Sequence, residues 1–225
     1  MSKPTRRVDG GGPVLATLAQ VYWKPAYKYT RVHWQRSRSD AEELTEAFFG
    51  SELTPATFAA FDPARERLRS FLRTGLDRFV SGGRVAPERS GGLAIRADFD
   101  AAERELAQAG SAFTSDPEQL FEAEWLRQLT AVATQRLRAE LVAKRKREHL
   151  QVFELLQLSD VPPTYAAVAE QRGIAITDVT NRLSYARRAF RRVALELLRE
   201  ITAGDADFRA EADAVFGVGD LDAAQ

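Results

Sequence analysis

Apolar residues recur at helical spacing along most of this chain. In each of several long segments they fall three or four residues apart, which places them on one face of a helix. No window shows sustained alternation of apolar and polar residues between turn signals, which is the pattern of a half-buried strand. The sequence therefore predicts an all-α protein. Helices are expected over residues 13–36, from 39, from 63, over 98–108, from 117 towards 148, over 150–158 and over 164–199.

Two of these helical patterns are joined at a single glycine within residues 164–199. Ala169 is a small residue where two crossing helices would touch, and Gly173 follows four positions later, where a turn needs positive φ. Val179 lies six positions further on, where the second helix would pack back on the first. This spacing is typical of a helix-turn-helix. An ordinary helical hairpin with a solvated polar face has the same spacing.

The second helix of this pair has an apolar stripe and a polar face. The stripe repeats at steps of four and three residues and consists of Val179, Leu183, Ala186, Phe190, Val193 and Leu197. The opposite face carries side chains that can bond to bases and phosphates, namely Thr180, Asn181, Ser184, Tyr185, Arg187, Arg188 and Arg191.

An acidic helix is expected after a capping box at Ser39. The Ser39 hydroxyl would accept from the Glu42 amide while the Glu42 side chain reaches back to the start of the helix. Acidic residues in a first turn suit the helix dipole and need no partner. They also form a candidate docking face, which points outward and contains Glu42, Glu43 and Glu46.

The next helix is expected to begin at Asp62 and Pro63, as N-cap and first helical residue. Its predicted buried stripe is Leu68, Phe71, Leu72, Leu76 and Phe79. A solvated arginine face is common on such helices, but arginines interleaved with aromatics are also what a nucleic-acid groove requires. The arginines of this helix are Arg65, Arg67, Arg69, Arg73 and Arg78.

A longer helix is expected to start at Pro117, after a cap at Ser115. Its predicted inner face is Leu126, Leu129, Ala133, Leu137 and Leu141, and a basic cluster at 144–147 lies near its end. The expected organisation is a flexible arm at 1–12, a helical domain at 13–80, a linker with a short helix at 81–115, a second helical domain at 116–202 and an acidic tail at 203–225.

Composition narrows the classes of function. Lys and Arg total 32, as do Asp and Glu, so the net charge is zero and supplies no global field toward nucleic acid. The chain has no cysteine and only two histidines, His33 and His149, far apart in sequence. We therefore expect no disulfide, metal site, cofactor or catalytic set, and an enzyme is the least favoured class. No signal peptide or membrane-spanning apolar run is found, so a cytoplasmic protein is expected.

Several motifs of the chain resemble RNA polymerase sigma factors of the extracytoplasmic-function (ECF) type. The upstream motifs are an aromatic helix, a Phe-Phe pair and an Arg-Ser-Phe-Leu signature, found at Val21-Tyr-Trp-Lys-Pro-Ala-Tyr27, Phe48-Phe49 and Arg69-Ser-Phe-Leu72. The downstream motif, Thr164 to Arg192, resembles the promoter-reading helix-turn-helix of that family. With the helix from Pro117 to Arg138, the resemblance covers most of residues 14–200.

The resemblance implies a protein that joins core RNA polymerase, recognises promoter DNA and helps to open it, with no cofactor and no catalysis of its own. Residues 13–80 would correspond to sigma region 2 and residues 116–202 to sigma region 4. An anti-sigma factor or other regulatory protein is a further partner class, and no membrane contact is implied.

The resemblance also assigns roles to individual residues. Docking on the polymerase would fall to Asp40, Glu42, Glu43 and Glu46. Contacts to the −10 promoter element would come from Arg65, Arg67, Arg69, Arg73 and Arg78. The −35 element would be read by Thr177, Asp178, Thr180, Asn181, Arg182, Ser184, Tyr185, Arg187 and Arg188.

Three positions depart from the family pattern. Ser81-Gly82-Gly83 stands where relatives have more basic residues, and Gly50 to Pro55 stands where relatives continue a helix. Ala175 replaces the usual N-cap serine of the recognition helix, a loss of about 1 kcal/mol of capping. Two alternatives follow. One is a helix-turn-helix regulator that binds DNA without polymerase. The other is a diverged sigma-like interaction protein that does not open promoters.

Overall fold

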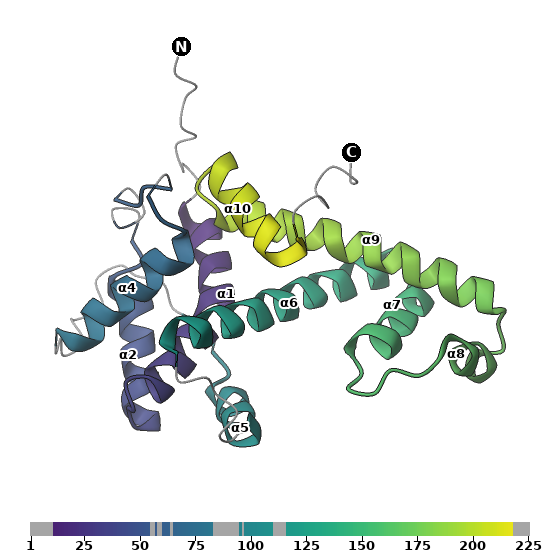
Figure 1. Ribbon diagram of the computed structural model, residues 1–225, viewed down its shortest axis with the longest axis horizontal. Coiled ribbons are helices and arrows are strands. Elements are labelled where there is room, and N and C mark those ends of the chain that lie inside the picture. Colours follow the sequence, from purple (N-terminus) through teal and green to yellow (C-terminus); the bar gives the residue numbers. More distant parts are fainter. Residues whose placement is uncertain are drawn as a thin grey trace, which may run out of the picture. The chain divides into compact units, whose positions relative to one another are not determined.

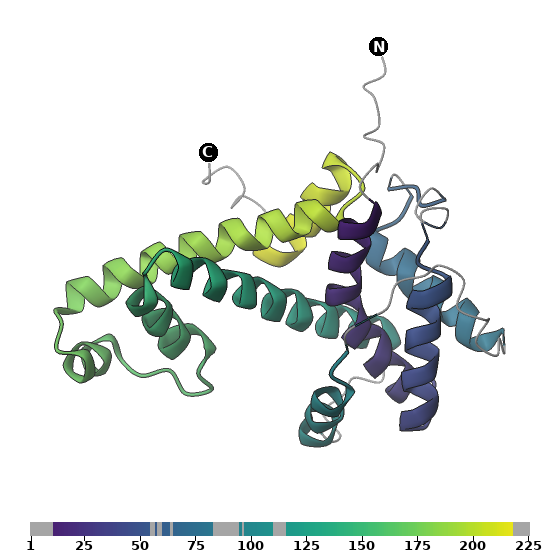
Figure 2. The same ribbon diagram turned by 180° about the vertical axis from the view of Figure 1, so that it is seen from behind.

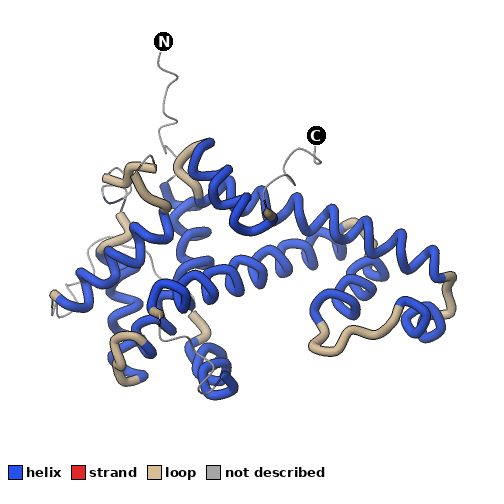
Figure 3. Tube along the Cα trace, in the orientation of Figure 1, coloured by secondary structure: helices blue, strands red, loops and turns tan. Residues whose placement is uncertain are grey.

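Helices make up the regular secondary structure of the part of the chain that the structure describes (Figure 1). The computed structural model describes residues 11–54, 57, 60–63, 65–82, 95, 97–109 and 116–217, and within these ranges it contains no strand (Figure 3). The all-α prediction is therefore confirmed. Residues 1–10 of the predicted arm, 83–94 of the predicted linker and 218–225 of the predicted tail lie outside the described residues. No helix in the described ranges combines the length and apolar character needed to cross a membrane.

The chain divides into two compact units. Unit 1 is Met1–Leu129 together with Leu198–Gln225, and unit 2 is Thr130–Leu197. The division falls inside two long helices, α6 (Pro117–Ala143) and α9 (Ile176–Ile201). Each of these helices therefore contributes one part to unit 1 and the other part to unit 2.

Unit 1 is built around α1 (Gly11–Val32), which continues through Pro25 without interruption (Figure 2). The helices that pack against α1 are α2 (Arg38–Ser51), α4 (Leu68–Ser81) and α5 (Phe99–Ala109). The helix α5 is the short helix expected at 98–108. The tail helix α10 (Asp205–Phe216) also belongs to this unit. The largest fully buried side chains of the unit include Tyr27, Tyr29, Phe49, Leu76 and Trp125.

The helix α2 begins two residues earlier than the sequence predicted. The hydroxyl of Ser37, and not that of Ser39, accepts a hydrogen bond from the Asp40 amide at 3.2 Å. The predicted capping box is therefore wrong in its register. Because the helix starts at Arg38, that guanidinium can pair with Glu42 one turn later, with an Nε–Oε1 distance of 2.7 Å.

The helix α4 begins at Leu68, five residues after the predicted start at Pro63. The Arg65 amide donates to the Asp62 carbonyl at 3.0 Å and closes a turn. The rings of Phe61 and Phe71 lie 5.3 Å apart. In a helix that began at Pro63, as predicted, Phe71 would lie about 12 Å along the axis from the first helical residue, too far to meet the ring of Phe61. Packing of Phe61 on Phe71 therefore requires the turn and overrides the local helix-start signal.

Unit 2 contains the remaining parts of α6 and α9, with α7 (Arg147–Phe153), a π-helical turn (Glu154–Leu158) and α8 (Tyr165–Arg172). The predicted long helix ends early, because α6 stops at Ala143 and Arg145 adopts a φ of +56°. The side chains of Leu141 and Phe153 share one buried core. A straight helix would hold these two residues about 18 Å apart, so the chain must turn between them.

The inner face predicted for α6 is correct with one exception. Leu129, Ala133, Leu137 and Leu141 are fully buried, whereas Leu126 is 41% exposed. The other four residues are spaced four apart, and position 125, not 126, continues that spacing. Leu126 is therefore rotated away from the core-facing side of the helix.

Candidate nucleic-acid interface

The connection between α8 and α9 is closed by local hydrogen bonds. The Thr164 hydroxyl caps α8 by accepting from the Ala167 amide at 3.1 Å. Gly173 follows α8 in the left-handed conformation, with φ +63° and ψ +36°, and its amide donates to the Ala169 and Glu170 carbonyls. The Ile174 amide also donates to Ala169, at 3.1 Å. This is the glycine conformation that the sequence predicted for the turn.

The apolar stripe of α9 is buried as predicted. Val179, Leu183 and Ala186 lie in the core of unit 2 with Val168 and Ala169 of α8. Phe190 is only partly buried and packs on Phe153 at 5.5 Å between ring centroids. The burial of the stripe fixes the rotation of α9 about its axis, so the opposite face points to solvent.

The solvent-directed side chains of this helix define a face that we call the α9 polar face. Its exposed members are Thr177, Asp178, Thr180, Asn181, Arg187 and Arg188, and its half-buried members are Arg182, Ser184 and Tyr185. The structure brings all nine predicted residues onto consecutive turns of one helix. Arg188 is exposed and has no ion-pair partner among the described residues.

Several cations on or near the α9 polar face already have partners within unit 2. Arg182 pairs with Glu148 at 2.6 Å. Arg187 Nε donates to the Gln157 side chain at 3.1 Å, and Arg172 of α8 donates to a side-chain oxygen of α7 at 2.7 Å. A nucleic acid that bound this face would have to compete with these exposed contacts, whose individual contribution to stability is small.

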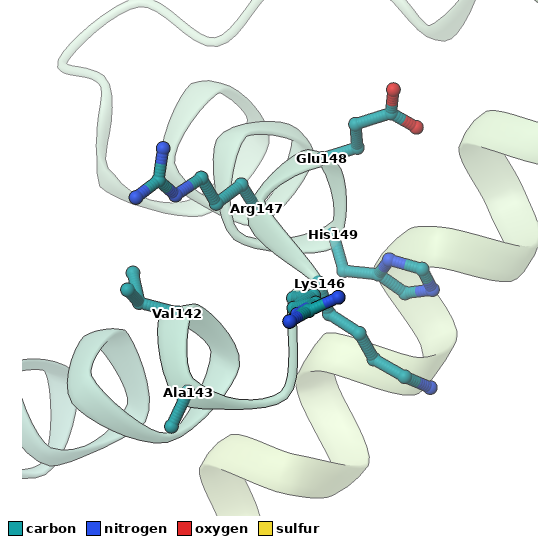
Figure 4. A pocket seen from close by; sticks show the side chains of 7 residues that line it. Val142, Ala143, Lys146, Arg147, Glu148 and His149 are labelled. Atoms are coloured by element: carbon teal, nitrogen blue, oxygen red, sulfur yellow. The ribbon is translucent and has the colours of Figure 1, made fainter.

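Tyr185 links the α9 polar face to a basic pocket at the turn between α6 and α7. Its ring lies 5.0 Å from the ring of His149, and the Lys146 ammonium lies 3.5 Å from the Tyr185 centroid. Figure 4 shows Lys146 and His149 directed toward the α9 ribbon. The pocket has a volume of about 580 Å³ and includes Arg145 and Arg147 in its lining.

The charge state of His149 follows from this setting. Burial lowers the pKa of its ring, and the neighbouring Lys146 and Arg182 lower that pKa further. Both effects favour the neutral form of the ring. The basic character of the pocket comes from its lysine and arginines alone. The basic cluster at 144–147 marked this region in the sequence, but the helix break that forms the pocket was not predicted.

The start of α9 lacks a side-chain cap at Ala175. The Ala175 carbonyl accepts from the Asp178 and Val179 amides, at 3.0 and 3.2 Å, so this residue is at the N-cap position. A methyl group cannot accept a hydrogen bond from the first helical amides. The structure therefore leaves the first turn of the α9 polar face without the usual hydroxyl or carboxylate cap.

The five arginines predicted for the −10 contact have different environments in unit 1. Arg65, Arg67 and Arg78 are exposed, and Arg65 pairs with Asp62 at 3.2 Å. Arg73 is half-buried between two carboxylates. Arg69 is only 5% exposed, so it does not share a surface with the other four.

Arg69 lies in a buried charge cluster with α10. Its Nη1 atom is 3.0 Å from an oxygen of Glu211, but neither Glu211 oxygen accepts a well-aligned hydrogen bond within the described residues. The guanidinium also lies 4.7 Å from the ring of Trp125. Burial raises the pKa of Glu211, and the charge of Arg69 opposes that rise. No local sequence signal could have identified this pairing, because the partners are far apart in the chain.

The acidic residues of α2 form an exposed face in unit 1. Asp40, Glu43 and Glu46 are exposed, while Glu42 is half-buried and pairs with Arg38. The acidic side chains therefore occupy consecutive turns of α2, as the sequence predicted, although the cap that begins the helix differs.

Comparisons with known proteins did not identify a family for this chain. No family model, curated protein or solved structure matches the chain. Within the described ranges, no group of three or more histidine and carboxylate side chains is placed to hold a metal ion.

Proposed function

We propose that the chain is a sigma factor of the ECF type, which binds core RNA polymerase in the cytoplasm and directs it to promoter DNA. The observation that carries this proposal is the pairing of α8 and α9 around Gly173, with the α9 polar face held outward. A helix N-terminal half that offers Thr, Asn and Arg side chains to solvent fits the major groove. On this proposal the α8–α9 pair is a helix-turn-helix and reads the −35 element.

The acidic face of α2 supports a second contact, with polymerase. Asp40, Glu43 and Glu46 are exposed and have no ion-pair partner among the described residues. Carboxylates that have no partner among the described residues can pair with a basic surface on another protein. The proposal gives this face the docking role and gives the protein no catalytic role.

A second candidate is a diverged sigma-like protein that binds polymerase or DNA but does not open promoters. The burial of Arg69 favours it, because one of the five arginines expected at the −10 element faces Glu211 instead of solvent. The half-burial of Arg73 between Asp77 and Glu118 favours it in the same way.

In-vitro transcription with purified core polymerase and a promoter library tests the proposal. The two variants to compare are Glu43→Lys and Asn181→Ala, each of which serves as the control for the other. We expect Glu43→Lys to weaken co-purification with polymerase. We expect Asn181→Ala to leave co-purification intact and to reduce promoter discrimination by about 1–3 kcal/mol if it contacts a base.

The outcomes separate the candidate functions. Transcripts from specific promoters with the unchanged chain support the sigma-factor proposal. Association with polymerase without transcripts favours the diverged protein. Binding to specific DNA in the absence of polymerase association favours an independent helix-turn-helix regulator. Salt-independent DNA binding would contradict any contact through the arginines. Each phosphate that an arginine neutralises should add about −0.9 to the slope of log binding constant against log salt concentration.

A further inference from the structure

Charged contacts hold α5 against α1 in unit 1. Glu105 accepts hydrogen bonds from the Lys24 and Lys28 ammonium groups, at 2.8 and 2.7 Å. These bonds hold the pKa of Glu105 below its usual value, although burial opposes the shift. Within α5, only Ala102 is buried. The helix therefore contributes little apolar surface to the core of unit 1.

A second carboxylate of α5 extends the same pattern by one helical turn of α1. Glu103 accepts from Arg31 Nε and from the Tyr27 hydroxyl, both at 2.7 Å. Hydrogen bonding by Arg31 lowers the pKa of Glu103. Asp100 pairs with Arg38 at 2.6 Å. Each acidic side chain of α5 therefore meets a cation on α1 or at the start of α2.

One aromatic side chain of α5 completes the contact. Phe99 lies edge-on to Trp23 at 5.6 Å between centroids and lies 4.8 Å from the ring of Tyr27. The α1 face under α5 thus combines two aromatic rings with cations at neighbouring positions along the helix. We call the set of Trp23, Lys24, Tyr27, Lys28 and Arg31 the α1 basic-aromatic face.

Partly solvent-exposed ion pairs hold α5 on α1. The side chains of Glu105 and Asp100 are 43% and 75% exposed, and that of Glu103 is 23% exposed. Exposed ion pairs contribute little to stability and weaken as salt rises. Elements with few buried apolar contacts open before the core does. Displacement of α5 would leave the buried Lys28–Glu124 pair of unit 1 in place, because neither partner lies on α5.

We propose that α5 covers a binding face for single-stranded nucleic acid on α1. Single-strand binding sites combine a basic track for the backbone with aromatic rings on which bases stack, and the α1 basic-aromatic face has both parts. In the covered state the α5 carboxylates take the places of phosphates, and Phe99 takes the place of a base. This inference does not depend on the proposed function, because it requires neither polymerase nor a promoter sequence.

Fluorescence anisotropy with the full chain tests this inference. The probe is a labelled oligothymidylate of about twelve nucleotides, within the range of known single-strand sites. The test variant is Glu103→Gln/Glu105→Gln. The matched control is Asp160→Asn/Glu170→Gln, which changes the net charge equally at exposed positions with no ion pair among the described residues.

We expect the α5 variant to bind the oligonucleotide about tenfold more tightly than the unchanged chain, with the control within about twofold. Adding Lys24→Gln/Arg31→Gln to the α5 variant should abolish the gain. The circular dichroism of Glu103→Gln/Glu105→Gln shows whether the variant keeps its helices. If its helical signal falls, Glu105→Gln alone replaces it as the test variant, because that single change leaves the Glu103 contacts in place.

Three results would overturn the inference. Equal affinities for the α5 variant and the charge-matched control would show that only net charge matters. Binding of a peptide with the sequence of residues 98–109 to the α5 variant, without oligonucleotide binding, would assign the face to an acidic protein helix. A gain confined to double-stranded DNA of the same length would also contradict it, because stacked bases cannot reach Trp23 and Tyr27.

Discussion

Lys28→Met should destabilise unit 1 by about 3 kcal/mol, the lower end of the range for breaking a buried ion pair. The side chains of Lys28 and Glu124 are 3% and 1% exposed, and their charged atoms lie 2.8 Å apart. Removal of the ammonium leaves the Glu124 carboxylate buried with one partner fewer. The lower end applies because Arg127, which also contacts Glu124, remains in place.

Tryptophan fluorescence during urea unfolding measures this loss in unit 1 alone. The three tryptophans of the chain, at positions 23, 34 and 125, all belong to that unit. The matched control is Lys24→Met, which makes the same change one turn earlier on α1. Lys24 pairs with Glu105, whose side chain is 43% exposed, so the control should cost less than about 1 kcal/mol.

The combined variant Lys28→Met/Glu124→Leu completes the test. Because it removes both buried charges, it should recover most of the stability lost in Lys28→Met. Equal decreases in the free energy of unfolding for Lys28→Met and Lys24→Met would refute the claim that burial makes the Lys28 pair the more important one. A combined variant less stable than Lys28→Met would refute the assignment of the loss to an uncompensated carboxylate.

Three further predictions concern local structure. Gly173→Ala should cost about 1 kcal/mol in thermal unfolding followed by circular dichroism, because its φ is +63° and an added Cβ would meet no other atom. Ser37→Ala should cost about 1 kcal/mol in the same assay and Ser39→Ala much less, and the reverse order would contradict the observed cap. The pKa values of Glu103 and Glu105 are lowered, so their stabilisation is present above the unfolded value of 4.5 and is lost as pH falls below it. The protection factors of the α5 amides, which correct for the intrinsic slowing of exchange in acid, should therefore fall at a higher pH than those of the α1 amides.

Features set by neighbouring residues were predictable from the sequence, and features set by distant contacts were not. The left-handed turn at Gly173 and the buried stripe from Val179 follow from backbone sterics and helical periodicity. The start of α4 depends instead on packing between Phe61 and Phe71 across a turn. The local sequence could not distinguish Ser37 from Ser39 as the cap of α2, because both serines precede an acidic residue by three positions.

The candidate interface shows the same division. The sequence predicted which residues share the α9 polar face, because one periodic stripe determines the opposite side of a helix. It could not predict that Arg69 would be buried against Glu211, because charge and spacing within α4 are equally compatible with exposure. The role of α5 as a partner for α1 was likewise missed, since its carboxylates meet cations about 70 to 80 positions away in sequence.

The discontinuity of unit 1 has a consequence for synthesis on the ribosome. Residues 198–225 belong to the same unit as residues 1–129, but they are translated only after the whole of unit 2. Until α10 emerges, Arg69 lacks the Glu211 carboxylate that it faces in the finished protein. Unit 2 is contiguous and can complete its core first. A nascent chain that stops before residue 198 would therefore contain all of unit 2, while Arg69 of unit 1 would still lack its Glu211 partner.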